Sequence, residues 1–166
     1  MELELVTGDI TKQHVDAIVN AANTGMRGGG GVDGAIHRAG GAAILADCVT
    51  RFPNGLQTGR AGWTTAGDLP ATWVIHVVGP NYHRGQHDRS LLTSCYSNAL
   101  TVADELGAQS IAFPLVSAGA YGWPLDDAVR AAVDTLRGTT SEVQRCVMVA
   151  FGSSSYDALR RALTES

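Results

Sequence analysis

Two polar side chains flank a glycine-rich segment and could act together on a phosphorylated ligand. Asn23 follows an apolar run, and Asp33 lies at the start of a helical pattern. Between them stand four consecutive glycines, Gly28, Gly29, Gly30 and Gly31. Their backbone N–H groups can cradle phosphate oxygens. A carboxylate at a helix N-terminus could orient or deprotonate a water molecule, and an asparagine can donate and accept hydrogen bonds at once. The alternative interpretation is that Asn23 caps a turn and Asp33 caps the helix.

The same segment satisfies the pattern GxGxxG through Gly29, Gly31 and Gly34. After a strand and before a helix, this pattern suggests a dinucleotide site. A nicotinamide site also needs an acidic residue about 20 positions further on, to hold the ribose hydroxyls. Residues 50–55 contain no Asp or Glu. We therefore interpret the segment as a cradle for phosphate oxygens, which disfavours a nicotinamide-dependent oxidoreductase.

Alternating strand and helix patterns must position these residues. We expect strands over residues 3–7, 17–22, 62–66, 73–78, 110–116 and 146–151. We expect helices over residues 32–52 with an interruption at Gly40-Gly41, from Asp88 to Gly107, from Pro124 to near Gly138, and after Ser153 or Ser154. Such alternation predicts a three-layer α/β/α sandwich with a central mixed, largely parallel sheet, in which ligands bind at the carboxyl ends of strands. We expect one domain over residues 1–166.

Composition narrows the classes of protein and partner. The chain has 166 residues, 45% of them hydrophobic, and a net charge of −4. No run of about 18 apolar residues and no signal-peptide pattern is present, so we expect a protein without membrane contact. Cys48, Cys95 and Cys146 lie far apart and form no metal-binding spacing, which favours a reducing, cytoplasmic location and no zinc. No basic run marks a surface for long nucleic acid.

Two segments of the chain resemble the signature of a known family. The first covers residues 16–23, Asp-Ala-Ile-Val-Asn-Ala-Ala-Asn, and the second covers residues 28–38, Gly-Gly-Gly-Gly-Val-Asp-Gly-Ala-Ile-His-Arg. Together they resemble the macrodomain family, specifically its MacroD-type branch. The resemblance continues in the family's order through residues 8–11, 66–70, 74–80, 95–100 and 112–114. It thus extends over nearly the whole chain.

The resemblance implies a hydrolase that acts on esters of ADP-ribose. Its substrates would be mono-ADP-ribose on Asp or Glu side chains of proteins and O-acetyl-ADP-ribose. Such an ester needs only an activated water, so neither a cofactor nor a metal is expected. The family's catalytic positions correspond to Asn23 and Asp33, and the carbon that the water attacks stays open. We expect the domain to act as a monomer.

The resemblance also implies which residues bind the ligand. Asp9 and Ile10 would contact adenine, and Phe151 would stack on it. The glycines, Gly28, Gly29, Gly30 and Gly31, would bind phosphate together with Val32. A second loop would wrap the diphosphate and consists of Ser117, Ala118, Gly119, Ala120 and Tyr121. Relatives commonly carry Thr in place of Ala118 and Val in place of Ala120, so this clamp is expected to be modestly looser.

Other readings of the same residues stay open. The chain could be a reader module that binds ADP-ribose without turnover, because Asp9, the two loops and Phe151 suffice for binding. His37 lies on the helix after the first loop and His76 lies within an apolar strand, and both are interpreted as hydrogen-bonded structural groups rather than ligands. His83 and His87 lie in a polar segment, residues 81–88, that the family resemblance does not explain.

Overall fold

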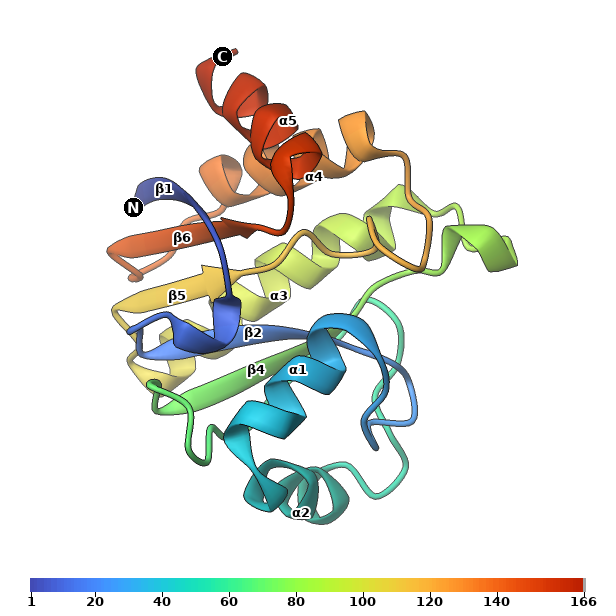
Figure 1. Ribbon diagram of the computed structural model, residues 1–166, viewed down its shortest axis with the longest axis vertical. Coiled ribbons are helices and arrows are strands. Elements are labelled where there is room, and N and C mark those ends of the chain that lie inside the picture. Colours follow the sequence, from blue (N-terminus) through green and yellow to red (C-terminus); the bar gives the residue numbers. More distant parts are fainter. Residues whose placement is uncertain (166) are drawn as a thin grey trace.

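Residues 1–165, which the computed structural model describes, form a six-stranded sheet between two layers of helices (Figure 1). The strands are β1 (Glu2–Thr7), β2 (Ala17–Ala22), β3 (Ala61–Thr65), β4 (Trp73–Val78), β5 (Ser110–Phe113) and β6 (Arg145–Ala150). Their order in the sheet is β1-β6-β5-β2-β4-β3. Only the edge strand β3 runs antiparallel to its neighbour, so the predicted mixed, largely parallel sheet is confirmed.

Helices cover both faces of this sheet, as the predicted three-layer sandwich requires. They are α1 (Gly31–Gly40), α2 (Ala42–Arg51), α3 (Arg89–Leu106), α4 (Leu125–Gly138) and α5 (Ser153–Thr164), with short 3₁₀ helices η1 (Ile10–Lys12) and η2 (Tyr82–Arg84). One core cluster joins α1, α2 and η1 to the sheet, and the other joins α3, α4 and α5 to it. Figure 1 shows α1 and α2 apart from α4 and α5.

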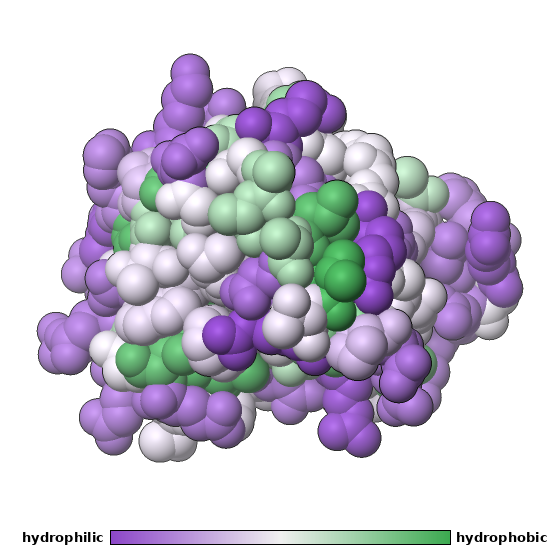
Figure 2. Space-filling view, turned by 90° about the horizontal axis from the view of Figure 1, so that it is seen from below, coloured by the Kyte–Doolittle hydropathy of each residue, from purple (hydrophilic) through white to green (hydrophobic). Residues whose placement is uncertain are grey.

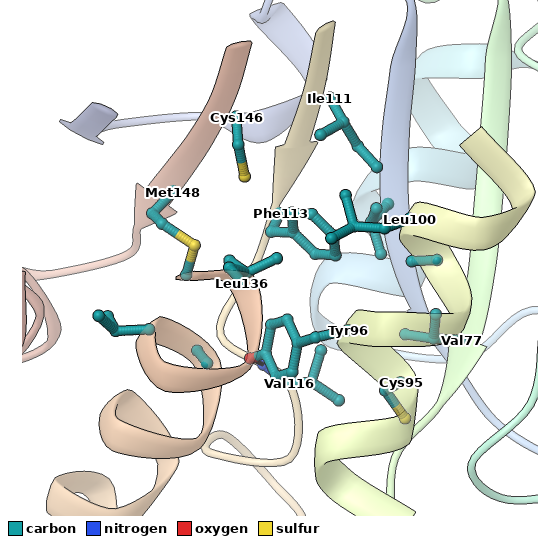
Figure 3. Close-up of a cluster of buried hydrophobic side chains, with 14 of the residues drawn as sticks. Val77, Cys95, Tyr96, Leu100, Ile111, Phe113, Val116, Leu136, Cys146 and Met148 are labelled. Carbon is teal, nitrogen blue, oxygen red and sulfur yellow. Dashed lines mark hydrogen bonds between the residues drawn. The ribbon is translucent and has the colours of Figure 1, made fainter. Parts of the chain in front are cut away.

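Strand alternation divides the apolar residues between the two faces. In β2, Ala17 and Val19 face α3 while Ile18 faces α1 and α2. Each side chain is fully buried, because parallel strands in the middle of a sandwich have no solvent face. Figure 3 shows part of the cluster on the α3 and α4 side, where Tyr96 of α3 packs against Phe113 of β5 with ring centroids 5.4 Å apart.

Local signals set most element boundaries. The side chain of Asp88 accepts a hydrogen bond of 3.0 Å from the Ser90 backbone N–H, and α3 ends at Gly107, whose φ is 74°. Both ends of this helix agree with the prediction. The predicted interruption at Gly40-Gly41 separates α1 from α2, because Gly41 adopts a φ of 82°.

Several boundary predictions were wrong. Strand β5 ends at Phe113 rather than at residue 116, since Pro114 has no N–H to continue the ladder. Helix α5 begins at Ser153, and its N-cap residue is Gly152, with a φ of 95°. The predicted caps, Ser153 and Ser154, therefore do not cap the helix through their side chains. Strands β1, β3 and β6 each begin one residue earlier than predicted, and β3 and β6 also end one residue earlier.

The surface carries apolar side chains in separate patches. Figure 2, which views the molecule from below Figure 1, shows them among polar residues. The large exposed apolar residues are Met1, Leu45, Val49 and Phe151. Within residues 1–165, none of the helices combines the length and the apolar character that crossing a membrane requires.

Candidate functional site

A cavity of about 310 Å³ lies at the carboxyl ends of three neighbouring strands, β5, β2 and β4. Ligands bind at this edge in open α/β sheets. Its lining comes from Ala21, Ala22, Asn23, Gly30, Gly31, Val32, Asp33, Gly79, Pro114, Leu115, Val116, Ser117, Gly119, Ala120 and Tyr121. The sheet thus brings together the two predicted catalytic residues and most of the second loop.

Asp33 lies in the first turn of α1 and is 5% exposed. Its Oδ1 atom accepts a hydrogen bond of 2.7 Å from Asn20 Nδ2 and lies 3.3 Å from His37 Nε2. The α1 dipole also favours a negative charge here. Asp33 does not cap the helix, since Gly30 occupies that position and has no side chain. The carboxylate is therefore fixed through one of its oxygens.

The side chain of Asn23 forms two hydrogen bonds with the backbone of the segment that follows it. Its Oδ1 accepts a hydrogen bond of 3.2 Å from the Met26 N–H, and its Nδ2 donates one of 3.1 Å to the Gly28 carbonyl. The turn-capping interpretation is therefore confirmed, and the same side chain also lines the cavity. A Cβ on Gly29 would lie 3.1 Å from both Asn23 Nδ2 and Asp33 Oδ2. The two side chains thus converge on one backbone position.

Hydrogen bonds at both ends of the second loop hold it in place. The Tyr96 hydroxyl of α3 accepts a hydrogen bond of 2.9 Å from the backbone N–H of Val116. The backbone N–H of Trp123 donates one of 2.9 Å to the Ser117 carbonyl. Ser117 adopts a φ of 66°, in the left-handed region, which costs a non-glycine residue about 1–2 kcal/mol. Its buried Oγ has no hydrogen-bond partner within residues 1–165. Strain and an orphaned hydroxyl at one position are typical of functional loops.

Asp9, Ile10 and Phe151 lie outside this cavity lining, at the ends of β1 and β6. Strands β1 and β6 are parallel neighbours, and the backbone N–H of Gly8 donates a hydrogen bond of 3.2 Å to the Ala150 carbonyl. Asp9 and Phe151 therefore follow the two strands at the same edge of the sheet. Hydrogen bonds from the Thr11 hydroxyl and backbone N–H hold the pKa of the exposed Asp9 carboxyl below its ordinary value. Phe151 is 88% exposed.

Three more predicted ligand-binding residues stand outside the lining. Gly28 and Gly29 support the loop rather than the cavity wall, as the contacts of Asn23 show. Ala118 packs against the core cluster on the α3 and α4 side.

Asn20, Thr64 and His76, which were not predicted as site residues, connect to Asp33 through hydrogen bonds. Asn20 Nδ2 lies 3.0 Å from His76 Nδ1, and His76 Nε2 lies 2.9 Å from Thr64 Oγ1. The prediction that His76 is a hydrogen-bonded group is confirmed. One signal could have found the connection, because a polar residue stands inside each of two apolar strands, and buried polar groups must find partners. Asn20 and His76 occupy partnered positions of β2 and β4.

Residues 81–88, which the motif left unexplained, brace the second loop. The backbone N–H of His83 donates a hydrogen bond of 3.1 Å to the Tyr121 carbonyl. Tyr82 packs edge-on against Trp123 with ring centroids 5.2 Å apart. His87 stacks on Tyr82 with ring centroids 4.0 Å apart. The segment therefore lies at the rim of the cavity and supports Tyr121 from outside.

Comparisons with known proteins agree with this architecture. The Macro domain family model matches residues 19–132. A Macro domain-containing protein of Streptomyces nogalater is 52% identical over 168 residues, which cover 99% of this chain and 93% of the relative. The chain belongs to the Macro domain family.

Further relatives connect this Macro domain to a ligand. A protein of Enterobacter cloacae subsp. cloacae named O-acetyl-ADP-ribose deacetylase is 44% identical over 170 residues, covering 99% of this chain and 94% of that protein. The solved structure of a Trypanosoma brucei macrodomain in complex with ADP-ribose has a TM-score of 0.88 and 39% identity, and covers 97% of this chain and 68% of that one.

The cavity of this Macro domain offers a fixed carboxylate, an amide and backbone groups of two loops. Within residues 1–165, no three His, Cys, Asp or Glu side chains are grouped so as to hold a metal ion. The three cysteines of the chain are buried, and burial raises the pKa of Cys95 to about 12, so this thiol has no nucleophilic character. The arrangement can hold a water against Asp33 beside an anionic ligand.

Proposed function

We propose that this Macro domain binds ADP-ribose and hydrolyses acyl esters of its distal ribose, as a MacroD-type enzyme. The substrates are O-acetyl-ADP-ribose and mono-ADP-ribose on Asp or Glu side chains of proteins. Water and the ester give a carboxylic acid and free ADP-ribose, and the reaction needs no redox partner. The supporting observation is that Asn23 and Asp33 line one cavity of about 310 Å³ together with Gly30, Gly31 and the second loop.

The geometry supports different roles for the two carboxylate oxygens of Asp33. Oδ1 is occupied by Asn20 and His37, so Oδ2 is the atom that accepts a proton from the attacking water. Asn23 is placed to hold the ribose hydroxyls next to this water. The N–H groups of Gly30, Gly31 and the second loop hold the diphosphate, and so fix the ester relative to the water.

An elongated ligand accounts for the residues that lie away from the cavity. Asp9 and Phe151 follow β1 and β6, whereas Asn23 follows β2, and β6 lies two strands from β2 in the sheet. Neighbouring strands are about 4.8 Å apart, so the two places are about 10 Å apart along the sheet edge. A diphosphate that bridges an adenosine and a second ribose matches this separation. Adenine then stacks on Phe151 and donates its amine to Asp9.

Acetate release from O-acetyl-ADP-ribose tests this function. We expect wild type to release acetate with turnover and Asp33→Ala to lose turnover by at least about 100-fold, while calorimetry still shows binding of ADP-ribose by both proteins. Asp157→Ala, which removes an exposed carboxylate on α5, is the matched control and should keep wild-type turnover. Binding without acetate release by wild type would make the domain a reader of ADP-ribose.

Water labelled with ¹⁸O identifies the carbon that is attacked in a protein ester. Attack at the ester carbonyl places the label in the released glutamate side chain, whereas attack at the anomeric carbon places it in the ribose. Mass spectrometry of both products distinguishes these routes. Label in neither product would contradict hydrolysis by water.

A further inference from the structure

A chain of buried polar side chains crosses the sheet and ends at Asp33. Asn20, Thr64 and His76 are each 0% exposed. They lie on neighbouring strands β2, β3 and β4, on the face that α1 and α2 cover. Polar groups at such depth are costly unless their hydrogen bonds are made. The position of this chain next to Asp33 therefore calls for a reason beyond the stability of the fold.

The protons of this chain have one consistent arrangement. Thr64 Oγ1 lies 2.9 Å from the Thr65 carbonyl oxygen and 2.9 Å from His76 Nε2, and it satisfies both when it donates its proton to the carbonyl and accepts from Nε2. His76 Nε2 therefore carries the ring proton, and Nδ1 presents a lone pair. That lone pair accepts one N–H of Asn20 at 3.0 Å. This tautomer of His76 agrees with both neighbours, because Asn20 Nδ2 also donates to Asp33 and Thr64 Oγ1 can accept on the far side of the ring.

The second N–H of Asn20 donates to Asp33 Oδ1 at 2.7 Å. With the amide reversed, the Asn20 carbonyl oxygen would face both the Asp33 carboxylate and the lone pair of His76 Nδ1, and both contacts would be repulsive. Asn20 Oδ1 is buried and has no partner within residues 1–165, so nothing on the oxygen side sets the orientation. The two acceptors, His76 and Asp33, decide which way the amide points.

Burial and the nearby His37 ring lower the pKa of His76 to about 3. The imidazole is therefore neutral at physiological pH, as the proton arrangement requires, and takes no part as an acid. Cys48 Sγ lies 3.9 Å from His76 Nε2. This nitrogen already donates to Thr64 at the shorter distance, so Cys48 stands beside the chain without being a link in it.

We propose that His76 is a positioning residue of the hydrolase, which orients the Asn20 amide so that Asn20 holds Asp33 Oδ1 and leaves Oδ2 to the attacking water. This inference rests on the proposed function. Asp33 Oδ2 is the carboxylate oxygen that faces Gly29 of the glycine-rich segment. Loss of the His76 acceptor removes one of the two groups that hold the Asn20 amide, so that Asn20 orients the Asp33 carboxylate toward the water less firmly.

Steady-state hydrolysis of O-acetyl-ADP-ribose by the full chain tests this role. His76→Phe keeps a ring of similar shape and removes both nitrogens. We expect its kcat to fall about 10- to 100-fold, while KM and the calorimetric Kd for ADP-ribose stay close to the wild-type values. His76→Asn can offer an amide oxygen near the position of Nδ1, and we expect it to recover most of kcat. Cys48→Ala removes a neighbour of the same ring and should leave kcat unchanged.

Several outcomes would overturn the inference. A folded His76→Phe protein with wild-type kcat would do so, and so would a parallel loss of kcat and of ADP-ribose affinity, which indicates general disruption of the site. Equal losses in His76→Phe and His76→Asn would also contradict it. If His76→Phe does not fold, Thr64→Val removes the acceptor of the His76 Nε2 hydrogen bond, and an unchanged kcat in that variant overturns the inference.

Wild type in the same assay separates this inference from the proposed function. No hydrolysis by wild type contradicts the hydrolase, and the inference falls with it. Hydrolysis by wild type together with full activity in His76→Phe contradicts only the positioning role. Hydrolysis by wild type, loss of kcat in His76→Phe and recovery in His76→Asn support both.

Discussion

The backbone N–H of Val116 donates a hydrogen bond of 2.9 Å to the hydroxyl of Tyr96, a side chain of α3 that is fully buried. This bond ties the segment after β5 to the helix behind the sheet, directly before the strained Ser117. The loop proposed to hold the diphosphate therefore begins at a fixed point in the core (Figure 3).

Tyr96→Phe should destabilise the protein and loosen this loop. The substitution leaves the buried Val116 N–H without an acceptor, which costs about 1–3 kcal/mol in the free energy of unfolding. Urea denaturation measures this loss, and calorimetry should show weaker binding of ADP-ribose. Tyr156→Phe, on α5 and away from the loop, should change neither quantity by much. Equal stability of Tyr96→Phe and wild type would contradict the role of the bond.

Gly34→Ala should displace the glycine-rich segment. A Cβ at Gly34 would lie 2.6 Å from the Gly29 carbonyl oxygen, and this neighbour is backbone rather than a flexible side chain. We expect a loss of about 1–3 kcal/mol in the free energy of unfolding and weaker ADP-ribose binding. Gly138→Ala at the end of α4, where a Cβ meets nothing within 4 Å, is the control. A Gly34→Ala protein as stable as this control would contradict the close approach.

Local signals explain how much of the fold the sequence predicts. Helix α3 follows from its periodicity, from Asp88 as its cap and from Gly107 at its end, all of which lie within or beside the helix itself. The end of β5 was misplaced, since apolar residues continue to Val116 although the strand ends at Phe113. Here the missing N–H of Pro114 outweighs the apolar pattern.

Part of the candidate site could be predicted from local sequence, and part of it could not. Asn23 and Asp33 were predicted because they flank one short segment, and the structure places both at the cavity. The connection of Asp33 to Asn20 and His76 depends on the register between β2 and β4, which are separated by more than 50 residues along the chain. Register between parallel strands is set by packing against both helical layers, and no local pattern in either strand encodes it.

The protein should become less stable as the pH decreases below 6.5, and His76 should account for part of this loss. Its folded pKa is lowered to about 3 from an ordinary value of 6.5. Between these two values the unfolded chain binds a proton at this residue and the folded chain does not. The free energy of unfolding therefore decreases as pH falls below 6.5, by up to about 1.4 kcal/mol per pH unit from this group.

Urea denaturation of wild type and His76→Asn at several pH values between 7 and 4 checks this dependence. Asparagine does not titrate, so the stability difference between the two proteins should shrink as pH falls. Differences that stay constant over this range would contradict a buried, neutral His76.

Asp9→Asn should weaken binding through the adenine. Its carboxylate is proposed to accept the exocyclic amine, and an amide is a weaker acceptor than a charged carboxylate. We expect about a 10-fold weaker Kd for ADP-ribose with an unchanged kcat. The analogue with hypoxanthine in place of adenine lacks the amine, so wild type should bind it more weakly than ADP-ribose and Asp9→Asn should discriminate less. Equal discrimination by both proteins would remove Asp9 from adenine recognition.

Release of free ADP-ribose from a protein mono-ADP-ribosylated on glutamate tests whether Asp33 and Asn23 carry the proposed hydrolysis. Wild type, Asp33→Ala and Asn23→Ala are compared at equal concentration, with ADP-ribose affinity measured for each. The account predicts release by wild type and strong suppression in both variants, while Asp33→Ala still binds ADP-ribose. Release by Asp33→Ala at the wild-type rate would contradict the assignment of water activation to this carboxylate.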